Sequence, residues 1–262
     1  MNVFLIVNSS SKNFKNLDNF LNQDFKDWKV IVITNCNYKN DKAKIINYVF
    51  KYWNEAFTYF YTNNKEAIEY IAFLDDDDYI NVNNRLNEFN KVKDFDYWHD
   101  TPVYKNTNYH YNSISHNNSC IMCKYNMINI DLIKVTYSLS DLFLYLPFIN
   151  SKIHIGGKNT IINLHSFNNY NEFFDYYYNR ISLRFTDLSY ILSTISFRNL
   201  NDKQIKILNR EYIKYRCMIG YPPKIQLSYL LDKNILFAYL NRNKTLDFFA
   251  RNEYNNMYKV KQ

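Results

Sequence analysis

Glycine is scarce in this sequence: it occurs three times in 262 residues, at positions 156, 157 and 220. A loop that cradles phosphates with backbone N–H groups needs several glycines close together after a strand. The nucleophile elbow of an α/β-hydrolase needs a glycine two residues away on each side of its serine. The sequence therefore argues against P-loop proteins, Gly-rich dinucleotide-binding folds and hydrolases of that type.

Long apolar runs are also missing. No run approaches the ~18 residues that a membrane-spanning helix needs. The polar residues Asn2 and Asn8 interrupt the apolar start, which does not resemble a secretory signal. Only four cysteines are present, and we expect them to be free thiols in a reducing compartment. We therefore expect a cytoplasmic protein, and we keep open a peripheral contact with a membrane surface.

Three potential zinc ligands, His116, Cys120 and Cys123, occur close together. A structural zinc site needs four closed ligands, and no second Cys/His pair lies near these three in the sequence. We interpret their spacing as coincidence.

Positive charge is distributed unevenly. The formal net charge is +7, and the excess of Lys and Arg lies in residues 166–262, whereas residues 1–165 are neutral. Aromatic residues are abundant, with 26 Tyr and 20 Phe. A basic, aromatic segment can bind phosphates, anionic lipid headgroups or nucleic acid. A solvated Lys-rich surface would explain the charge equally well, so both interpretations stay open.

The first third of the chain alternates between predicted strands and helices. Three short apolar runs predict buried parallel strands, namely Val3–Val7, Trp28–Thr34 and Tyr70–Leu74. Apolar residues at helical spacing predict helices over residues 14–21 and 41–53. This alternation indicates an α/β protein with a mostly parallel sheet. Ligands bind beyond the carboxyl ends of such strands, so we expect loops 8–11, 34–37 and 75–78 to face one crevice.

The rest of the chain changes character near residue 170. Residues 139–146 are predicted to be helical, and residues 152–155 and 160–165 are predicted strands around a tight turn at Gly156-Gly157. Beyond about residue 170, helical spacing dominates. We therefore divide the chain into a sheet domain, 1–168, and a helical basic and aromatic region, 169–262.

Four consecutive carboxylates, Asp75 to Asp78, directly follow the third predicted strand. Adjacent carboxylates repel one another unless a cation neutralises them, and hard divalent cations prefer oxygen ligands. Taken alone, the run fits a solvated acidic turn and a metal site equally well. Its place at the end of the most apolar strand favours a site for Mn²⁺ or Mg²⁺ that bridges a diphosphate.

These segments, taken in order, resemble the first half of a family 2 glycosyltransferase. The resemblance covers roughly residues 1–85 and rests on Val3–Val7, Leu17 with Asn22-Gln23-Asp24-Phe25, Trp28–Thr34, and Phe73-Leu74-Asp75-Asp76-Asp77-Asp78. It implies a GT-A fold, which is a Rossmann-like, mostly parallel sheet flanked by helices, here with a helical C-terminal extension. It also implies a metal-dependent, inverting transfer of a sugar from a nucleoside-diphosphate sugar to an acceptor hydroxyl.

The resemblance assigns roles to the acidic run and to the loops beside it. Asp75 and Asp77 match the Asp-x-Asp motif, so they would contact the metal, the diphosphate and the ribose, and Asp78 is an alternative metal ligand. The residues that match the nucleobase-binding positions are Asn8, Ser9, Thr34 and Asn35.

Two residues in the second half also match positions of the family. Asp141 falls where the family keeps an acidic dyad and would be the general base, which removes the proton from the acceptor hydroxyl. A helix cap formed by Ser140 or Asp141 would explain these residues as well. His165 falls where many members keep a histidine near the metal or diphosphate, although a structural role fits a lone histidine after a strand too.

The sequence departs from the family in two loops. The family usually has an aspartate in the second loop, and here none occurs before Asp41. The region 61–67 lacks the glycine and arginine that members commonly carry there, so no contact is carried over to it. The Trp98-His99-Asp100 run is interpreted as packing or as part of an acceptor cleft.

The expected partners follow from the resemblance and from charge. We expect a UDP- or GDP-sugar donor, Mn²⁺ or Mg²⁺, and a glycan, lipid-linked or protein acceptor, without nucleic acid. Two alternatives stay open. One is a nucleotidyltransferase, although residues 8–12 lack the Gly-rich basic loop that it needs. The other is a non-catalytic nucleic-acid-binding or scaffold protein that uses the basic, Tyr-rich C-terminal region.

Overall fold

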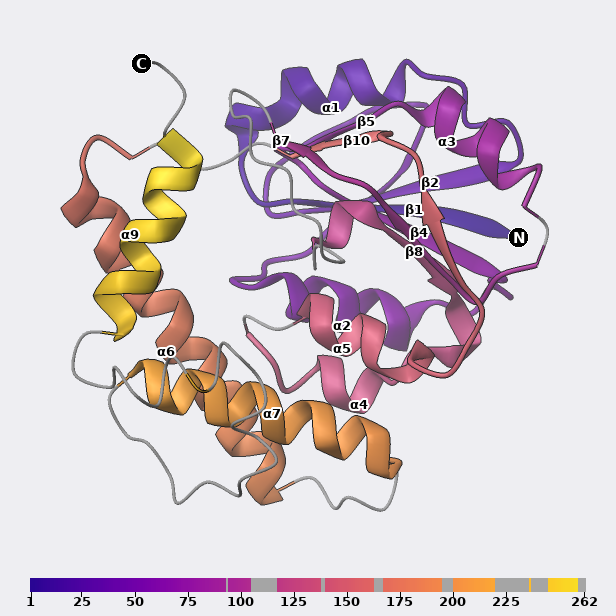
Figure 1. The fold of residues 1–262 in the computed structure, drawn as a ribbon. Helices are drawn as coiled ribbons and strands as arrows, with labels where there is room; N and C mark the ends of the chain where they lie inside the picture. The colour runs from indigo at the N-terminus through magenta and orange to yellow at the C-terminus, as the bar shows by residue number, and fades with distance from the viewer. Residues whose placement is uncertain are drawn as a thin grey trace. The chain divides into compact units, whose positions relative to one another are not determined.

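The structure is a computed structural model of the 262-residue chain. It describes residues 1–92, 94–104, 117–137, 140–162, 167–194, 200–219, 236 and 245–258. The chain forms two compact units (Figure 1). The first comprises Met1–Lys134 and Ser140–Leu164, and the second comprises Val135–Leu139 and His165–Gln262.

A seven-stranded sheet forms the centre of the first unit. Its order is β3 (Lys44–Asn47), β2 (Trp28–Thr34), β1 (Asn2–Asn8), β4 (Tyr70–Asp75), β8 (Ile121–Lys124), β6 (Tyr97–Asp100) and β9 (Ile153–Gly156). The first four strands are parallel, β8 is antiparallel to both β4 and β6, and β9 is parallel to β6. The predicted α/β class with a mostly parallel sheet is therefore confirmed.

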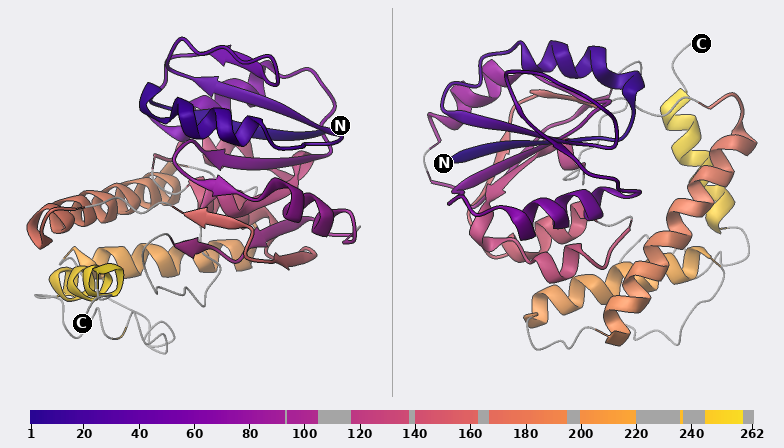
Figure 2. Two further views of the ribbon diagram at one scale, coloured as in Figure 1. Left: turned by 90° about the horizontal axis from the view of Figure 1, so that it is seen from above. Right: turned by 180° about the vertical axis from the view of Figure 1, so that it is seen from behind.

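Helices cover both faces of this sheet. On one side lie α1 (Phe14–Leu21) and α3 (Val82–Phe89), and on the other lie α2 (Trp53–Asn63), α4 (Ile130–Ile133) and α5 (Ser140–Tyr145) (Figures 1 and 2). Short 3-10 turns connect the elements at η1 (Ser11–Asn13), η2 (Asn118–Cys120), η3 (Tyr125–Met127) and η4 (Leu146–Phe148).

The central strands are apolar on both sides because both sides are covered. Phe4 and Ile6 belong to a core cluster with residues of α1 and α3. On the opposite side, Phe73 of β4 packs edge-on against Phe57 of α2, with ring centroids 5.4 Å apart. This double burial explains why the strand sequences are continuous apolar runs without a polar alternation.

The expected helix over residues 41–53 is wrong. Its first part is the edge strand β3, which pairs with β2 from Ile31↔Lys44 to Thr34↔Asn47, and the helix α2 begins only at Trp53. Ile45 and Ile46 have β-branched side chains, which favour strands. Pairing with the open edge of β2 outweighs the helical spacing of the apolar residues, and Val49 is left 86% exposed.

A second, three-stranded sheet joins distant parts of the first unit. Its order is β5 (Tyr79–Ile80), β10 (Thr160–Ile162) and β7 (Val103–Tyr104). β5 directly follows the acidic run, so this sheet ties the end of that run to β10.

The second unit is helical, as expected for the C-terminal part. It contains α6 (Tyr170–Thr194), α7 (Asp202–Met218) and α9 (Thr245–Tyr258). Arg184 of α6 donates to the hydroxyl of Tyr215 of α7 over 3.0 Å, and Tyr170 donates to Asp247 of α9 over 2.7 Å. Within the described ranges, none of the helices is both long and apolar enough to cross a membrane.

Candidate functional site

The carboxyl ends of β1, β2 and β4 bring the three predicted loops to one edge of the sheet. Asn8 is aligned with Thr34 in the pairing of β1 with β2, and Val7 is aligned with Asp75 in the pairing of β1 with β4. The acidic run therefore begins beside the loops that follow Asn8 and Thr34. This adjacency follows from parallel pairing, as the sequence predicted.

Asp76 ties the acidic run to the end of β1. Its Oδ2 accepts hydrogen bonds from the side-chain amide of Asn8 over 2.8 Å and from the backbone N–H of Ser9 over 3.0 Å. The side chain is only 8% exposed. Asp76 therefore has a structural role inside the protein, although it lies within the acidic run.

Asn8, Thr34 and Asn35, which the resemblance assigns to the nucleobase, also make internal contacts. The hydroxyl of Thr34 donates to Oδ1 of Asn8 over 2.7 Å, and both residues are fully buried. The side-chain amide of Asn35 donates to the carbonyl of Phe50, and its oxygen accepts from the N–H of Phe50. These contacts shape the loops, and the binding roles of the three residues stay predictions.

The other end of the acidic run is tied to Ser119, in η2. The backbone N–H of Asp75 donates to Oγ of Ser119 over 3.0 Å, and the same hydroxyl donates to Oδ2 of Asp78 over 2.7 Å. Asp78 is 8% exposed and Ser119 is fully buried. Asp75 and Asp77, in contrast, are only partly buried. The acidic run is therefore a turn with two buried and two more accessible carboxylates.

Gln23, which follows α1 in the chain, holds the segment that leads from the acidic turn into α3. Gln23 donates through its amide to the carbonyl of Ile80 over 3.1 Å and accepts from the N–H of Val82 over 3.0 Å. Asn81 then caps α3, because its side chain accepts from the N–H of Asn84. These contacts fix where α3 begins and hence where its next residues point.

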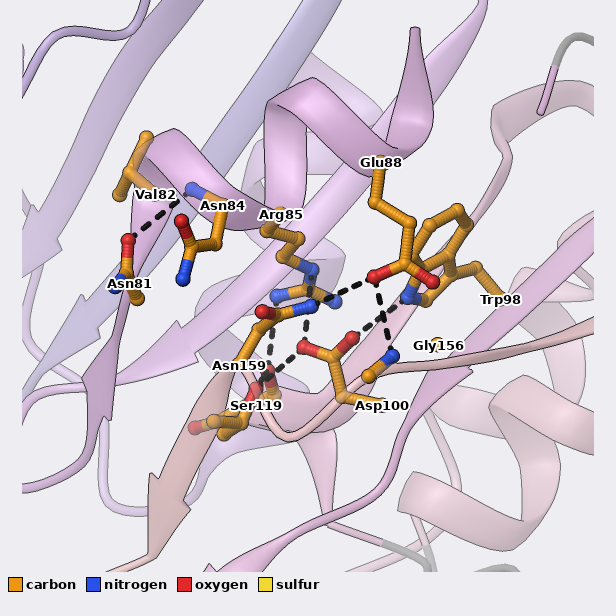
Figure 3. Close-up of polar contacts among 12 residues, drawn as sticks. Asn81, Val82, Asn84, Arg85, Glu88, Trp98, Asp100, Ser119, Gly156 and Asn159 are labelled. Atoms are coloured by element: carbon orange, nitrogen blue, oxygen red, sulfur yellow. Dashed lines mark hydrogen bonds and ion pairs between the residues drawn. The ribbon is translucent and has the colours of Figure 1, made fainter. Parts of the chain in front are cut away.

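A buried ion pair lies directly beside this region (Figure 3). Arg85 of α3 and Asp100 of β6 both have fully buried side chains, and Nε of Arg85 is 3.3 Å from Oδ2 of Asp100. Asp100 also accepts from Nε1 of Trp98 over 2.8 Å and from the hydroxyl of Thr160 over 2.6 Å. Asp100 is thus a packing residue, which is one of the two roles expected for the Trp98-His99-Asp100 run.

Arg85 connects this pair to Ser119. Its Nη1 donates to the backbone carbonyl of Ser119 over 3.1 Å. Neither Arg85 nor Ser119 was predicted from the sequence to belong to the site. No local signal marks them, because the contacts that place them in the site join residues 15 to 44 positions apart along the chain.

The β9–β10 turn is attached to α3 by Glu88. This carboxylate contacts Nε2 of His154 at 3.2 Å and accepts from the N–H of Gly157 and the amide of Asn159. Burial alone would raise the pKa of Glu88, but these hydrogen bonds outweigh it and hold the pKa below its usual range. A side chain on Gly156 would meet Trp98, whose Nε1 would lie 2.4 Å from the added Cβ.

Two predicted site residues cannot be placed. His165 lies outside the described residues. Asp141 lies in the first turn of α5, but its side chain is outside the described part as well. Their roles near the diphosphate and as general base stay predictions.

The acidic turn offers a suitable donor set for a hard divalent cation, since carboxylate oxygens are the ligands that Mg²⁺ and Mn²⁺ prefer. Its more accessible members, Asp75 and Asp77, would be the ligands. In the part of the chain that the structure describes, no three His, Cys, Asp or Glu side chains are already gathered as a metal site. The roles of Asp75, Asp77 and Asp78 as metal ligands therefore stay predictions.

The cysteines near this region are buried and free. Burial, with the negative charges of Asp100 and Asp78, raises the pKa of the Cys120 thiol well above its usual range. Burial also raises the pKa of Cys123. Both thiols therefore stay protonated at neutral pH. His116, the third potential zinc ligand noted in the sequence, lies outside the described residues.

Solved structures of S. aureus TarS resemble this chain over its whole length. A structure of TarS 1–349 matches with a TM-score of 0.54 at 13% identity, and covers 99% of this chain and 92% of that one. TarS 1–349 in complex with UDP-GlcNAc matches with a TM-score of 0.52 at 14% identity, over 98% and 89% of the two chains. TarS 1–349 in complex with UDP gives a TM-score of 0.52.

Comparisons by sequence gave no match. No protein-family model matches the chain, and no curated protein sequence does so. At 13–14% identity the likeness to TarS shows the fold. The chain thus has the predicted GT-A fold, a mostly parallel seven-stranded sheet flanked by helices.

Proposed function

We propose that this protein is a glycosyltransferase that binds a nucleoside-diphosphate sugar at the acidic turn. The observation that carries the proposal is the position of Asp75 to Asp78 at the carboxyl end of β4, in a fold shared with a protein solved with UDP-GlcNAc and with UDP. The first of these ligands is a sugar nucleotide, and the second is what remains after the sugar has left.

The geometry of the turn narrows which carboxylates would face the donor. Asp76 accepts two hydrogen bonds from the end of β1, and Asp78 accepts one from Ser119. Turning Asp76 outward would take an acceptor from the buried amide of Asn8, and turning Asp78 outward would take one from the buried hydroxyl of Ser119. A buried donor without its acceptor costs about 1–3 kcal/mol. Asp75 and Asp77 are the more accessible members, so we assign the donor contacts to them.

We propose that Asp75 and Asp77 would hold Mn²⁺ or Mg²⁺ together with the diphosphate. A bound divalent cation would neutralise the charge that develops on the nucleoside diphosphate as it leaves. The chain's own contribution is to hold the two carboxylates at a fixed place, since the neighbouring Asp76 and Asp78 anchor the turn on both sides.

The acceptor half of the proposal rests on the sequence. Asp141 would take the proton from the acceptor hydroxyl as that oxygen attacks the anomeric carbon from the face opposite the diphosphate. The sugar would then be transferred with inversion. The acceptor would be a hydroxyl group of a glycan, a lipid-linked glycan or a protein, and contact with a membrane surface belongs to the same proposal.

A donor-hydrolysis assay tests the proposal without knowledge of the acceptor. The protein is incubated with UDP-, GDP- and dTDP-sugars, with Mn²⁺ or with a chelator, and the released nucleoside diphosphate is quantified. We expect slow, metal-dependent release from one nucleotide class, and we expect Asp141→Asn to lower it at least tenfold. Folded protein that neither binds nor cleaves any of these donors would refute the assignment.

A further inference from the structure

One buried hydroxyl, that of Ser119, contacts both the first and the last residue of the acidic turn. Oγ of Ser119 accepts from the N–H of Asp75 and donates to the carboxylate of Asp78, over 3.0 and 2.7 Å. The turn itself is closed by the N–H of Asp78, which donates to the carbonyl of Asp75 over 3.1 Å. A serine hydroxyl has one proton to donate, and Ser119 donates it to the carboxylate of Asp78.

Ser119 is in turn held by groups from other segments. Its carbonyl accepts from Nη1 of Arg85 over 3.1 Å and lies 3.5 Å from the hydroxyl of Thr160. Its N–H donates to the side chain of Asn117 over 2.8 Å. Figure 3 shows Ser119 below the guanidinium of Arg85 and next to Asp100. The hydroxyl is therefore presented by a backbone that is fixed from both sides.

The ion pair fixes the direction of Arg85. Nε of Arg85 lies 3.3 Å from Asp100, and neither side chain has any exposed surface. Asp100 is itself held by Trp98 and Thr160. A guanidinium is planar and rigid, so an ion pair that keeps Nε beside Asp100 also restricts the direction of Nη1. The buried pair therefore orients the contact to Ser119.

We propose that Ser119 is a positioning residue for the donor site, and that Arg85 and Asp100 hold it in place. The inference rests on the proposed function and deepens it. The hydroxyl keeps Asp78 turned inward and Asp75 at a fixed place, so that the turn is already formed when the diphosphate arrives. Ordering a loop on binding lowers affinity, and a preformed loop avoids this loss.

The first test uses the nucleotide-free protein. Amide hydrogen exchange of Asp75, followed by NMR, is compared between wild type and Ser119→Ala. We expect the Asp75 amide to exchange at least tenfold faster in the variant, because its acceptor is gone. Thr101→Val is the matched control: it also removes one hydroxyl, and the Thr101 hydroxyl donates to the carbonyl of Gly156 over 3.1 Å and not to the acidic turn. It should leave the Asp75 amide protected.

The second test measures UDP affinity with Mn²⁺ by calorimetry for the same proteins. We expect Ser119→Ala to weaken UDP binding about five- to tenfold and Thr101→Val to change it less than twofold. Ser119→Cys keeps a hydrogen-bonding group at the same position but with a weak donor, so it should fall between wild type and Ser119→Ala. This variant also serves if Ser119→Ala does not fold.

The two tests separate this inference from the proposed function. Faster exchange without loss of UDP affinity would overturn the positioning role, and so would weaker binding with an unchanged Asp75 amide. Wild-type protein that binds no nucleotide would refute the proposed function and with it the donor-site role. The exchange experiment would still show whether Ser119 holds the turn.

Discussion

Replacing Arg85 by Met should destabilise the first unit strongly. The guanidinium lies 3.3 Å from the Asp100 carboxylate, with both side chains fully buried. At an effective dielectric constant of about 20, two unit charges at this distance attract by about 5 kcal/mol. Removing one partner leaves the other as an unpaired buried charge, for which losses of about 3–5 kcal/mol are typical.

The loss can be measured on the relevant unit. All three tryptophans, at positions 28, 53 and 98, lie in the first unit, so urea unfolding followed by their fluorescence reports on that unit alone. We expect Arg85→Met to lower its free energy of unfolding by about 3–5 kcal/mol. At about 2–4 °C for each kcal/mol, the melting temperature should fall by about 6–20 °C.

A double-mutant cycle measures the interaction energy between Arg85 and Asp100. Asp100→Leu alone should cost about as much as Arg85→Met, while the double variant should lose at least ~2 kcal/mol less than the sum. Asp94→Ala breaks an exposed ion pair with Lys152 and should cost less than about 1 kcal/mol. Additive losses in the cycle, or a loss below 1 kcal/mol for Arg85→Met, would refute the assignment of a coupled buried pair.

Two further predictions concern the same unit. Gly156→Ala should destabilise it by more than about 2 kcal/mol, because the new Cβ would lie 2.4 Å from Nε1 of the buried Trp98. Gly157→Ala would bring its Cβ to 3.2 Å from Glu88 and 3.4 Å from Asn159, a milder approach to the ends of two side chains, and should cost less than half as much in the same urea experiment. For Asp96, the hydrogen bond from Lys124 holds the pKa below its usual value. Its stabilisation should therefore be complete above about pH 4 and vanish as pH falls through the lowered native value. Asp96→Asn should accordingly be less stable than wild type at pH 7, and this deficit should shrink as the pH falls below about 4. A deficit that does not change over this range would contradict the cause.

Much of the fold can be predicted from the sequence because its signals are local. Three runs are apolar on both faces, as is typical of parallel strands covered on both sides: Val3–Val7, Trp28–Thr34 and Tyr70–Leu74. Their order implies that the loops after them meet at one edge. The structure has these strands with near-identical bounds.

The edge strand β3 could not be predicted in the same way. Its apolar residues, Ile45 and Ile46, are only partly buried and fit a helical spacing with Phe50. What makes this segment a strand is the free edge of β2, a partner outside the segment. A pattern within the segment does not contain that information.

The support of the acidic turn also depends on distant partners. The sequence marks the four aspartates and the resemblance assigns them roles, but four identical side chains do not reveal which of them are buried. They differ in the structure because Asp76 contacts the end of β1 and Asp78 contacts Ser119, 41 residues further along the chain. Long-range pairing of this kind leaves no local signal.

The most direct test of the central claim is UDP binding by calorimetry, with and without Mn²⁺, for wild type, Asp77→Ala and Asp27→Ala. Asp27 precedes β2 at the opposite edge of the sheet, so its replacement removes the same charge away from the site. We predict Mn²⁺-dependent binding for wild type and Asp27→Ala, and at least tenfold weaker binding for Asp77→Ala. Equal UDP affinity for all three folded proteins, or no binding to any of them, would contradict a donor site at the acidic turn.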